Sequence, residues 1–579
     1  MRYLALATDY DGTLAHHGRV DEPTLEALGR LRESGRKLIL VTGRELDELL
    51  EVFPHIDRFD RVVAENGALL YRPDDRSEKA LGERPPDTFL EALRRRGVDR
   101  VSVGRVIVAT WEPHQVAVVE AIREAALELQ VIFNKGAVMI LPSGVNKATG
   151  LSAALEELGL SPHNVVSVGD AENDHAFLAV SECAVAVSNA LETVKERADI
   201  LTKSDHGAGV VELIDMMLED DLETASAGLP RHDILLGRRD DGTEERISPY
   251  GLNVLVAGTS GSGKSTMTTG FLERLAEAGY QYAIIDPEGD YEALDGAVTL
   301  GTPRRVMTVE EVLEILDTPT QNVDVNLLGI ALGHRPAFFE ELLPRLQDLR
   351  ARTGRPHWIV IDETHHLLPV TWDPAELTLP KKLCNMLYIT VHPESVAQPI
   401  LESVDLLLAV GEAPEKTIAA FCAAVGEEPP ALEATTLESG QTLVWRRRSG
   451  QPPVKVKSQP PRSEHYRHSR KYAEGNLGPD RSFRFRGADA KLNLPAQNLV
   501  VFLQMAEGVD DATWLFHLAQ ADYSRWFREQ IKDEELAAAA ERVESQPNVS
   551  AEESRAAIRA AIEQRYTLPS EPASGVVEV

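Results

Sequence analysis

The sequence predicts a multidomain α/β protein, and two observations carry that prediction. Two apolar strand-like runs, Leu4–Thr8 and Val254–Ala257, each pass directly into a glycine-containing polar turn. A helical pattern follows each turn, and strand, tight turn and helix form the repeating unit of α/β folds. The chain has 579 residues, which is more than one hydrophobic core accommodates, so we expect about three or four domains.

The composition is ordinary for a globular protein, with 43% hydrophobic and 26% charged residues. No window approaches the roughly 18 consecutive apolar residues of a membrane span, and the first strand begins too early to follow a signal peptide. Three widely spaced cysteines (Cys183, Cys384 and Cys422) favour a reducing cytoplasm. We therefore expect a cytoplasmic protein without a membrane partner. The formal net charge of −32 disfavours nucleic-acid binding over the whole surface.

Four segments of the N-terminal third place phosphate-handling side chains at the ends of predicted strands. Asp9 ends the first strand, where a carboxylate can attack phosphorus, and Asp11 can protonate the leaving oxygen. Thr42 follows a second apolar strand and can donate to a phosphate oxygen. Lys147 precedes a helix, where its charge can pair with the nucleophile and the phosphate. A third strand, 165–169, ends in acids, which predicts a Mg²⁺ site. The expected metal-binding residues are Asp9, Asp11, Asp170 and Asp174.

This ordered set of four motifs resembles the haloacid dehalogenase superfamily of phosphatases, in the subgroup with a cap between the second and third motifs. The resemblance covers residues 1–215 and implies a Rossmann-like core with a small α+β cap at about 72–142. It implies that Asp9 becomes phosphorylated, that Asp11 is the general acid/base, and that Lys147 supports them. So compact a cap resembles those of phosphoglycolate- and sugar-phosphate-type members, which implies a small phosphorylated metabolite as substrate. The cap side chains that could face the site are Arg105, Asn134 and Lys135.

A complete motif for binding a nucleoside triphosphate occupies the middle of the chain. The GxxxxGKS pattern at 258–265 follows a strand and precedes a helix, where backbone N–H groups can wrap the phosphates of ATP. Lys264 would reach the β and γ oxygens, and Ser265 would ligate Mg²⁺. A later buried strand is followed by Asp362, for the same Mg²⁺, and Glu363, to polarise the attacking water. The expected ATP-binding residues are Gly258, Thr259, Ser260, Gly261, Ser262, Gly263, Lys264, Ser265 and Thr266.

The surroundings of this motif resemble the HerA–FtsK class of P-loop ATPases. A strand at 282–286 ends in an acidic turn, and a short hairpin at 240–247 leads into the P-loop strand. The resemblance covers 233–448 and implies a second α/β domain in a homo-oligomer, commonly a hexamer. The class usually has an amide at the end of the sensor strand, whereas this chain has His392. The short spacing between the two ATPase motifs disfavours processive translocation.

The segment from Arg446 to Arg486 holds twelve basic residues against three acids, a balance of +9 in a chain of −32. Three interpretations stay open: contact with a neighbouring subunit's nucleotide, contact with nucleic acid or another polyanion, and a solvated linker. Arg446, Arg447 and Arg448 are candidates for the first. The remaining expected segments are linkers at 216–232 and 449–464, a basic helical module at 465–535 with Trp514 and Trp526 in its core, and a helical tail with a disordered end at 536–579.

Together the motifs predict a Mg²⁺-dependent phosphate-monoester hydrolase fused to a domain that binds and hydrolyses ATP. Two alternatives remain. In one, the chain is an ATP-driven nucleic-acid translocase or processing protein with an accessory phosphatase. In the other, ATP binding gates a metabolic phosphatase. Salt-dependent DNA binding would favour the first, and phosphatase activity that responds to ATP would favour the second.

Overall fold

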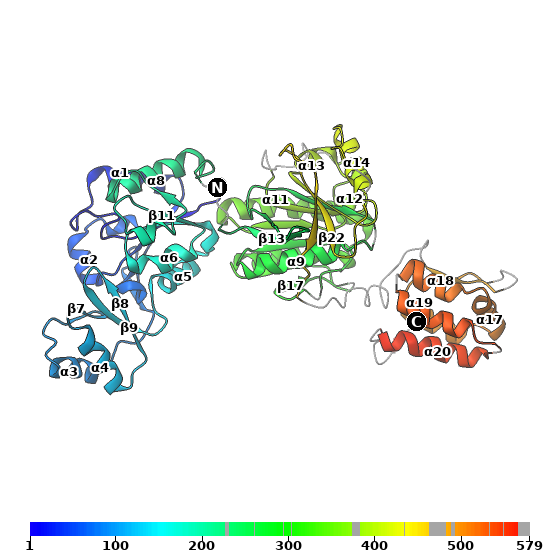
Figure 1. Cartoon of the computed structure of the whole chain (residues 1–579), viewed down its shortest axis with the longest axis horizontal. Coiled ribbons are helices and arrows are strands. Elements are labelled where there is room, and N and C mark those ends of the chain that lie inside the picture. Colours follow the sequence, from blue (N-terminus) through cyan, green and yellow to red (C-terminus); the bar gives the residue numbers. More distant parts are fainter. Residues whose placement is uncertain are drawn as a thin grey trace, which may run out of the picture.

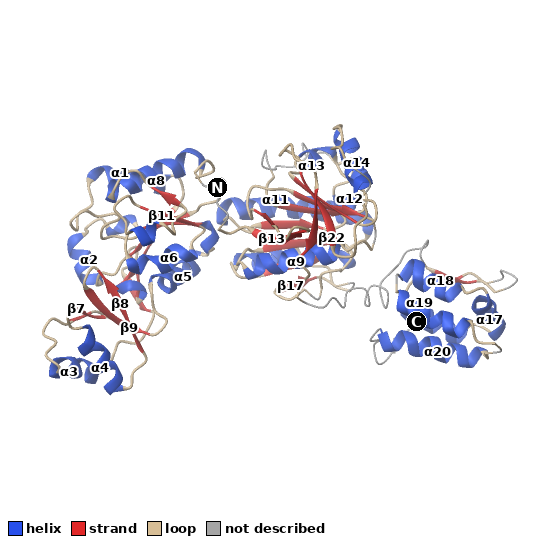
Figure 2. Ribbon diagram, in the orientation of Figure 1, coloured by secondary structure: helices blue, strands red, loops and turns tan. Residues whose placement is uncertain are grey.

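The computed structural model contains an N-terminal α/β domain, a second α/β domain and a C-terminal helical module, as Figure 1 and Figure 2 show. The structure describes residues 1–225, 231–259, 261–292, 294–302, 304–372, 383–432, 435–462, 482–487, 492–531, 533–547 and 549–565. Within these ranges, no helix combines the length and the apolar character that a bilayer crossing requires.

The N-terminal domain is built on an eight-stranded sheet of order β12-β11-β10-β1-β2-β3-β4-β5. From β12 to β3 neighbouring strands are parallel, while β4 and β5 add an antiparallel edge. The strands are β1 (Ala5–Thr8), β2 (Lys37–Val41), β3 (Arg61–Ala64), β4 (Leu69–Arg72), β5 (Ser77–Ala80), β10 (Val165–Gly169), β11 (Cys183–Ala186) and β12 (Ile200–Leu201). The helices are α1 (Glu22–Glu33), α2 (Leu46–Val52), α5 (Lys147–Leu158), α6 (His175–Val180), α7 (Glu192–Lys195) and α8 (His206–Asp220). Because β1 is buried along its whole length, Asp9 leaves the sheet at the carboxyl end of a central strand.

The cap is a separate four-stranded antiparallel sheet of order β6-β7-β9-β8 with two helices packed on it (Figure 1). Its elements are α3 (Asp87–Arg95), β6 (Ser102–Val103), β7 (Val108–Trp111), α4 (Gln115–Ala125), β8 (Leu129–Asn134) and β9 (Ala137–Pro142). The predicted start of the cap at residue 72 is too early, since β5 pairs with β4 in the core sheet. This edge strand is largely exposed, so its polar residues gave no strand pattern.

The second domain has an eleven-stranded sheet of order β14-β13-β23-β22-β21-β15-β20-β19-β16-β18-β17. The strands are β13 (Ile234–Arg239), β14 (Glu244–Ile247), β15 (Val254–Gly258), β16 (Tyr282–Asp286), β17 (Ala297–Leu300), β18 (Asn322–Asn326), β19 (Trp358–Ile361), β20 (Met386–Thr390), β21 (Leu406–Val410), β22 (Gln441–Arg446) and β23 (Val454–Ser458). The helices are α9 (Lys264–Glu277), α10 (Val309–Asp317), α11 (Arg335–Thr353), α12 (Thr364–Leu367), α13 (Gln398–Glu402) and α14 (Pro414–Val425). The predicted linker 449–464 therefore contains a strand, β23, that joins this sheet between β13 and β22.

Hydrogen bonds join the two α/β domains directly. The Tyr280 hydroxyl donates to Glu182 at 2.9 Å, and the Tyr250 hydroxyl donates to the carbonyl oxygen of His163 at 3.0 Å. The Arg355 guanidinium donates to the carbonyl oxygen of Gly159 at 2.7 Å. The side chains at this boundary are mostly buried, which makes it a defined interface.

The C-terminal module has one hydrophobic core. A short hairpin of β24 (Phe483–Phe485) and β25 (Leu494–Ala496) packs with helices α16 (Leu499–Gly508), α17 (Asp511–Ala519), α18 (Asp522–Trp526), α19 (Glu534–Glu544) and α20 (Ala551–Arg565). Trp514 and Trp526 are buried in it, as predicted. Residues of α19 and α20 belong to the same core, so the division expected at 535/536 does not separate two units. Ala537 and Ala540 of α19 and Ile558 and Ile562 of α20 pack inward.

Candidate active sites

A buried lysine joins two of the predicted aspartates in the N-terminal domain. Lys147 begins α5, and its ammonium donates to Asp9 Oδ1 at 2.5 Å and to Asp174 Oδ1 at 2.6 Å. The Asn146 side chain caps the same helix end by accepting backbone N–H groups. All three charged side chains are buried. The structure thus brings together the nucleophile and the supporting lysine that the sequence predicted.

Asp170 completes a cluster of three buried carboxylates. Single oxygens of Asp9, Asp170 and Asp174 all lie within 4.8 Å of one another, and Thr13 donates to Asp170 Oδ1 at 3.2 Å. Burial and then the charge of Asp174 raise the pKa of Asp9 to about 8, against the attraction of Lys147. A divalent cation would relieve this repulsion, and carboxylate oxygens are the ligands that Mg²⁺ prefers, so the residues fit the predicted metal.

The carboxylate of Asp11 lies outside this cluster and is bound by an arginine. Arg44 donates to both of its oxygens, from Nε at 2.6 Å and from Nη2 at 2.7 Å. Asp11 therefore faces Arg44 in this conformation, and the pair must open before Asp11 can donate to a leaving oxygen. Arg44 was not among the predicted site residues, although it comes two residues after the motif residue Thr42.

Thr42 ends β2 as predicted and is buried beside the site. Its hydroxyl oxygen accepts from the backbone N–H of Arg44 at 3.2 Å, which holds the turn that carries the arginine. The neighbouring Asn173 donates from its amide to Asn66 Oδ1 at 2.9 Å, and Asp174 supplies the second carboxylate to the lysine.

The cap is held over the site from two sides. A buried carboxylate of the core, Glu65, accepts the backbone N–H groups of Arg105, Val106 and Ile107 at 2.7, 2.7 and 2.9 Å. From the opposite hairpin, Lys135 donates to Asp170 Oδ2 at 2.9 Å and to the carbonyl oxygen of Asp11 at 3.2 Å.

Of the three predicted cap residues, Lys135 is the one that contacts predicted site aspartates, Asp170 and Asp11. The Arg105 guanidinium instead pairs with Asp47 and Glu78 at the rim. The Asn134 side-chain oxygen has no hydrogen-bond partner among the described residues.

The phosphate-binding loop of the second domain has the backbone that its glycines permit. Gly261 and Gly263 have φ of +76° and +94°, values that strongly favour glycine. A Cβ atom at Gly258 would lie 2.2 Å from the carbonyl oxygen of Val410 on the neighbouring strand. Ser260, predicted to bind phosphate, lies outside the described residues. The positive φ of two glycines and the close approach of Val410 to the third therefore favour glycine at these positions, apart from any need to bind phosphate.

Lys264 begins α9 and lies folded against its own loop. Its ammonium donates to the carbonyl oxygens of Gly258 and Thr259, both at 3.0 Å. Phosphate oxygens could replace these two acceptors. Ser265, the predicted Mg²⁺ ligand, is the next residue of the same helix end and is half-buried.

The predicted acidic pair ends β19, one strand away from the P-loop strand. Asp362 is buried, and burial followed by the charges of Glu363 and Asp290 raises its pKa well above the ordinary range. Glu363 has a left-handed φ of +42°, and its carboxylate lies 3.5 Å from His365 Nδ1. The same nitrogen lies 3.1 Å from the hydroxyl of Thr390 on the intervening strand β20. An imidazole thus connects the acid to the sensor strand.

His392, which departs from the amide usual at the end of the sensor strand, lies beyond the end of that strand. Strand β20 ends at Thr390, and His392 follows in a turn where its side chain is 57% exposed and contacts Glu394 at 3.1 Å. Thr390, by contrast, is buried against His365. Thr390 rather than His392 therefore ends the strand, and its hydroxyl lies beside the acidic pair through His365.

The arginine triplet is bound within its own domain. Arg446 pairs with Glu245 at 2.8 Å, Arg447 with Glu427 at 2.6 Å and Arg448 with Asp405 at 3.0 Å. Because β22 runs antiparallel to β21, its end lies at the opposite edge of the sheet from the P-loop. Much of the remaining basic segment, 463–481, lies outside the described residues.

Comparisons with known proteins match both α/β domains. Residues 6–92 and 101–214 match the haloacid dehalogenase-like hydrolase family, and 252–353 match the central domain of helicase HerA. The chain is 31% identical over 220 residues to phosphoglycolate phosphatase 2 of Saccharolobus solfataricus, an alignment that covers 37% of this chain and 92% of that protein. The chain belongs to the haloacid dehalogenase-like hydrolases.

A second relative, phosphoglycolate phosphatase of Methanothermobacter thermautotrophicus, is 31% identical over 217 residues, which are 36% of this chain and 96% of that protein. Among solved structures, a haloacid dehalogenase-like hydrolase from Bacteroides thetaiotaomicron aligns with a TM-score of 0.33 and 20% identity over 37% of this chain and 99% of that chain. The resemblance inferred from the four motifs is thus confirmed, and the hydrolase domain shares its chain with a HerA central domain.

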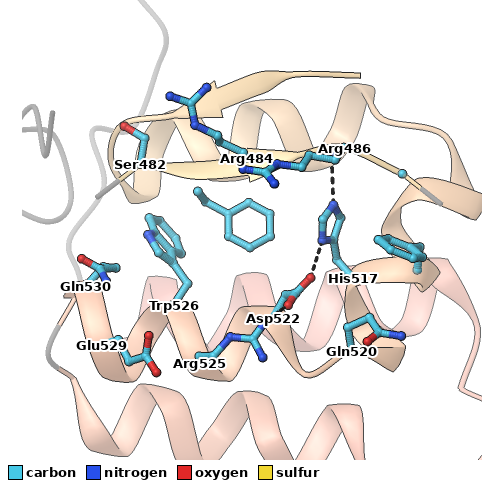
Figure 3. Close-up of a pocket in the computed structure, with 13 residues that line it drawn as sticks. Ser482, Arg484, Arg486, His517, Gln520, Asp522, Arg525, Trp526, Glu529 and Gln530 are labelled. Carbon is cyan, nitrogen blue, oxygen red and sulfur yellow. Dashed lines mark hydrogen bonds and ion pairs between the residues drawn. The ribbon is translucent and has the colours of Figure 1, made fainter. Parts of the chain in front are cut away.

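The C-terminal module adds a cavity of about 720 Å³ that belongs to neither site (Figure 3). Arg484 and Arg486 of the hairpin and Arg525 of α18 line it. At its side, His517 accepts from the backbone N–H of Arg486 at 3.0 Å and donates to Asp522 at 2.7 Å, the contacts dashed in Figure 3. These bonds give His517 a structural role in fixing the hairpin on the helices.

Removing the cap lysine from the hydrolase site should weaken substrate binding. In Lys135→Met we expect KM for a phosphate monoester to rise about tenfold, roughly the free energy of one charge-assisted hydrogen bond. Steady-state kinetics of the full chain would measure this, with Lys135→Arg restoring part of the loss. Lys203→Met, at an exposed lysine, is the matched control. An unchanged KM in Lys135→Met would show that the lysine does not face the substrate.

Proposed function

We propose that the chain hydrolyses a small phosphate monoester in its N-terminal domain, with Asp9 as nucleophile and Mg²⁺ as cofactor. The observation that carries the proposal is the buried Lys147 bridge between Asp9 and Asp174, with Asp170 beside it. An ammonium fixed 2.5 Å from a carboxylate at a strand end orients that carboxylate and offsets the charge of an incoming phosphate.

The reaction balances in two steps on these residues. Asp9 Oδ attacks phosphorus, the bond to the substrate oxygen breaks, and Asp11 gives that oxygen a proton. Water then attacks the phosphorus of the aspartyl phosphate, Asp11 takes back a proton, and inorganic phosphate leaves Asp9. Bound near Asp9 and Asp170, Mg²⁺ would neutralise phosphate charge. To Thr42 we assign a hydrogen bond from its hydroxyl to a phosphate oxygen.

The substrate class follows from the cap and from the relatives. The cap closes through Glu65 and Lys135, and the second of these adds one cation above the carboxylate cluster. A compact anionic monoester suits this arrangement. The relatives named phosphoglycolate phosphatase support phosphoglycolate, or a sugar phosphate of similar size, as the first compounds to test.

A phosphate-release assay on the full chain tests this proposal. With a panel of small phosphate monoesters we expect Mg²⁺-dependent turnover of at least one two- to six-carbon compound, abolished by a chelator and restored by Mg²⁺. Larger phosphorylated substrates, such as phosphopeptides, serve as the comparison. Release from none of the small compounds, or the same rate without a divalent cation, would refute the assignment.

For the second domain we propose ATP binding and hydrolysis at Lys264, Ser265, Asp362 and Glu363. Gating of the phosphatase by ATP is the favoured alternative to translocation because one contact connects the two sites. Arg355, just before β19, binds the carbonyl oxygen of Gly159 just after α5, and α5 begins with Lys147. Assembly into a homo-oligomer stays a prediction from the HerA resemblance.

The same phosphate-release assay separates the two alternatives when it is run with and without a non-hydrolysable ATP analogue. A change in phosphatase rate that Arg355→Ala removes would support gating. Salt-sensitive DNA binding with an unchanged phosphatase rate would support a nucleic-acid function instead.

A further inference from the structure

Away from both phosphoryl sites, three metal-ligand side chains meet at the boundary of the two α/β domains. His163 lies in the turn before β10, Glu182 precedes β11, and His232 precedes β13 after the connection between the domains. One donor atom of each lies within 4.8 Å of the others. None of these residues takes part in the proposed phosphatase or ATPase chemistry.

The contacts of the His163 ring require a proton or a cation between its Nδ1 and Glu182. Its Nε2 is 2.6 Å from the carbonyl oxygen of Ala278, which can only accept, so Nε2 carries a proton. Its Nδ1 is 2.6 Å from Glu182 Oε2. Either a second proton or a cation must stand between that nitrogen and the carboxylate, because two lone pairs would repel each other.

A proton alone leaves one group of the cluster unsatisfied. The Nε2 atom of His232 is buried, lies 3.9 Å from Glu182 Oε2 and has no hydrogen-bond partner among the described residues. A cation bound to all three donors would satisfy His163, Glu182 and His232 at once.

We propose that His163 Nδ1, Glu182 Oε2 and His232 Nε2 bind one divalent transition-metal ion, Zn²⁺ by the chemistry of the donors. Imidazole nitrogens with a single carboxylate suit Zn²⁺, whereas Mg²⁺ prefers oxygen ligands. Tetrahedral ligands at Zn²⁺ distances lie roughly 3.3 Å apart. The separations of 2.6 and 3.9 Å from Glu182 Oε2 bracket that value, so small side-chain shifts would complete the site.

The surroundings resemble the outer shell of a metal site. The Nε2–H of His163 is held by a backbone carbonyl, the usual way in which a ligating imidazole is oriented. The hydroxyl of Tyr280 donates to Glu182 Oε2 at 2.9 Å, and Arg2 occupies the other carboxylate oxygen. A cavity of about 350 Å³, lined in part by Glu182 and His232, offers an entry path and room for a water as fourth ligand.

Such an ion would fasten the domain connection to the hydrolase domain beside the ATPase. Glu182 and His163 belong to the first domain, while His232 stands where the chain enters the second. The role we assign to it is structural, since the ion would lie at a hydrogen-bonded boundary between two domains. Loss of the ion should therefore loosen the boundary and leave each carboxylate or nucleotide site intact.

Cobalt binding to the full chain tests the proposal. The protein is the Asp170→Asn variant, which disables the carboxylate site, stripped of metal, free of nucleotide and kept in excess Mg²⁺. We expect one equivalent of Co²⁺ to give the intense visible absorption of a four-coordinate ion, and one equivalent of Zn²⁺ to abolish it. The absence of a stoichiometric band would overturn the proposal.

Single-residue variants test whether the Co²⁺ absorption band arises from an ion bound to the proposed ligands. His232→Asn should weaken Co²⁺ binding by more than the roughly 10–100-fold that loss of an outer-shell partner costs. The matched control His114→Asn, in the cap, should bind as the parent does. An equal band in His232→Asn would overturn the assignment. Zinc-edge X-ray absorption of the unmutated chain, loaded with Zn²⁺ in excess Mg²⁺, provides a readout that requires no variant, and a first shell without imidazole would also overturn it.

Discussion

Asp9→Asn should reduce phosphate-monoester turnover by roughly 10⁴-fold or more, because no other group can accept the phosphoryl group when the nucleophile is lost. The folded state should tolerate the change. Asp9 is a buried carboxylate whose pKa is raised to about 8 by burial and by Asp174, so a neutral amide relieves repulsion there. Phosphate release under saturating substrate would measure the loss, and thermal unfolding would confirm that the variant remains folded.

The matched control for this experiment is Asp57→Asn, at an exposed aspartate of the same domain. It should retain full turnover. ATP binding should be unchanged in Asp9→Asn, since the second domain has its own lysine and carboxylates. A parallel loss of phosphatase and ATP binding would contradict two independent sites, and residual turnover near that of the parent would show that Asp9 is not the nucleophile.

The residues that sequence reasoning found are those whose role depends on local backbone. Asp9, Thr42 and Asp170 each end a buried parallel strand, so the pattern of apolar run and polar turn places them at one edge of the sheet. Lys147 begins a capped helix that faces the same edge. For these side chains the local sequence was enough to predict that they lie close together at one edge of the sheet.

The residues that it missed act through partners far away in the chain. Arg44 holds Asp11 from another strand, and Glu65 holds the backbone of a cap loop some forty residues later. From the sequence alone, a charged residue after a strand that is exposed to solvent cannot be distinguished from one that pairs with a distant residue. Likewise, β23 is a short valine–lysine alternation between prolines, which resembles a linker. It forms a strand because it pairs with β13 and β22, and the sequence did not identify these partners.

The boundary that carries His163, Glu182 and His232 had no signature at all. The three residues come from separate turns, and their spacing matches no metal-binding motif. Only the packing of the two domains brings Ala278 and Tyr280 onto the hydrolase domain and orients the imidazole. Sites of this kind require the tertiary structure, because the donors meet only where the two domains pack together.

Glu363→Gln should bind ATP and hydrolyse it roughly 10²-fold or more slowly, since positioning and polarising the attacking water is an electrostatic task. The substitution keeps the shape of the side chain at a residue whose backbone is left-handed, and it removes the charge that lies 3.5 Å from His365. Asp362, which is buried beside it, keeps its metal-binding oxygens. Lys264→Ala should instead lose ATP binding, because the ammonium that can exchange loop carbonyls for phosphate oxygens is gone.

The measurement should be made in the Asp9→Asn background, so that phosphate released from ATP cannot come from the hydrolase domain. Binding of a fluorescent ATP analogue and steady-state phosphate release then report the two steps separately. Glu341→Gln, at an exposed glutamate of α11, is the control and should hydrolyse ATP at the parent rate. If Glu363→Gln hydrolyses ATP as fast as that control, the water-polarising acid is another residue. If it fails to bind ATP, the carboxylate serves the nucleotide site rather than the chemical step.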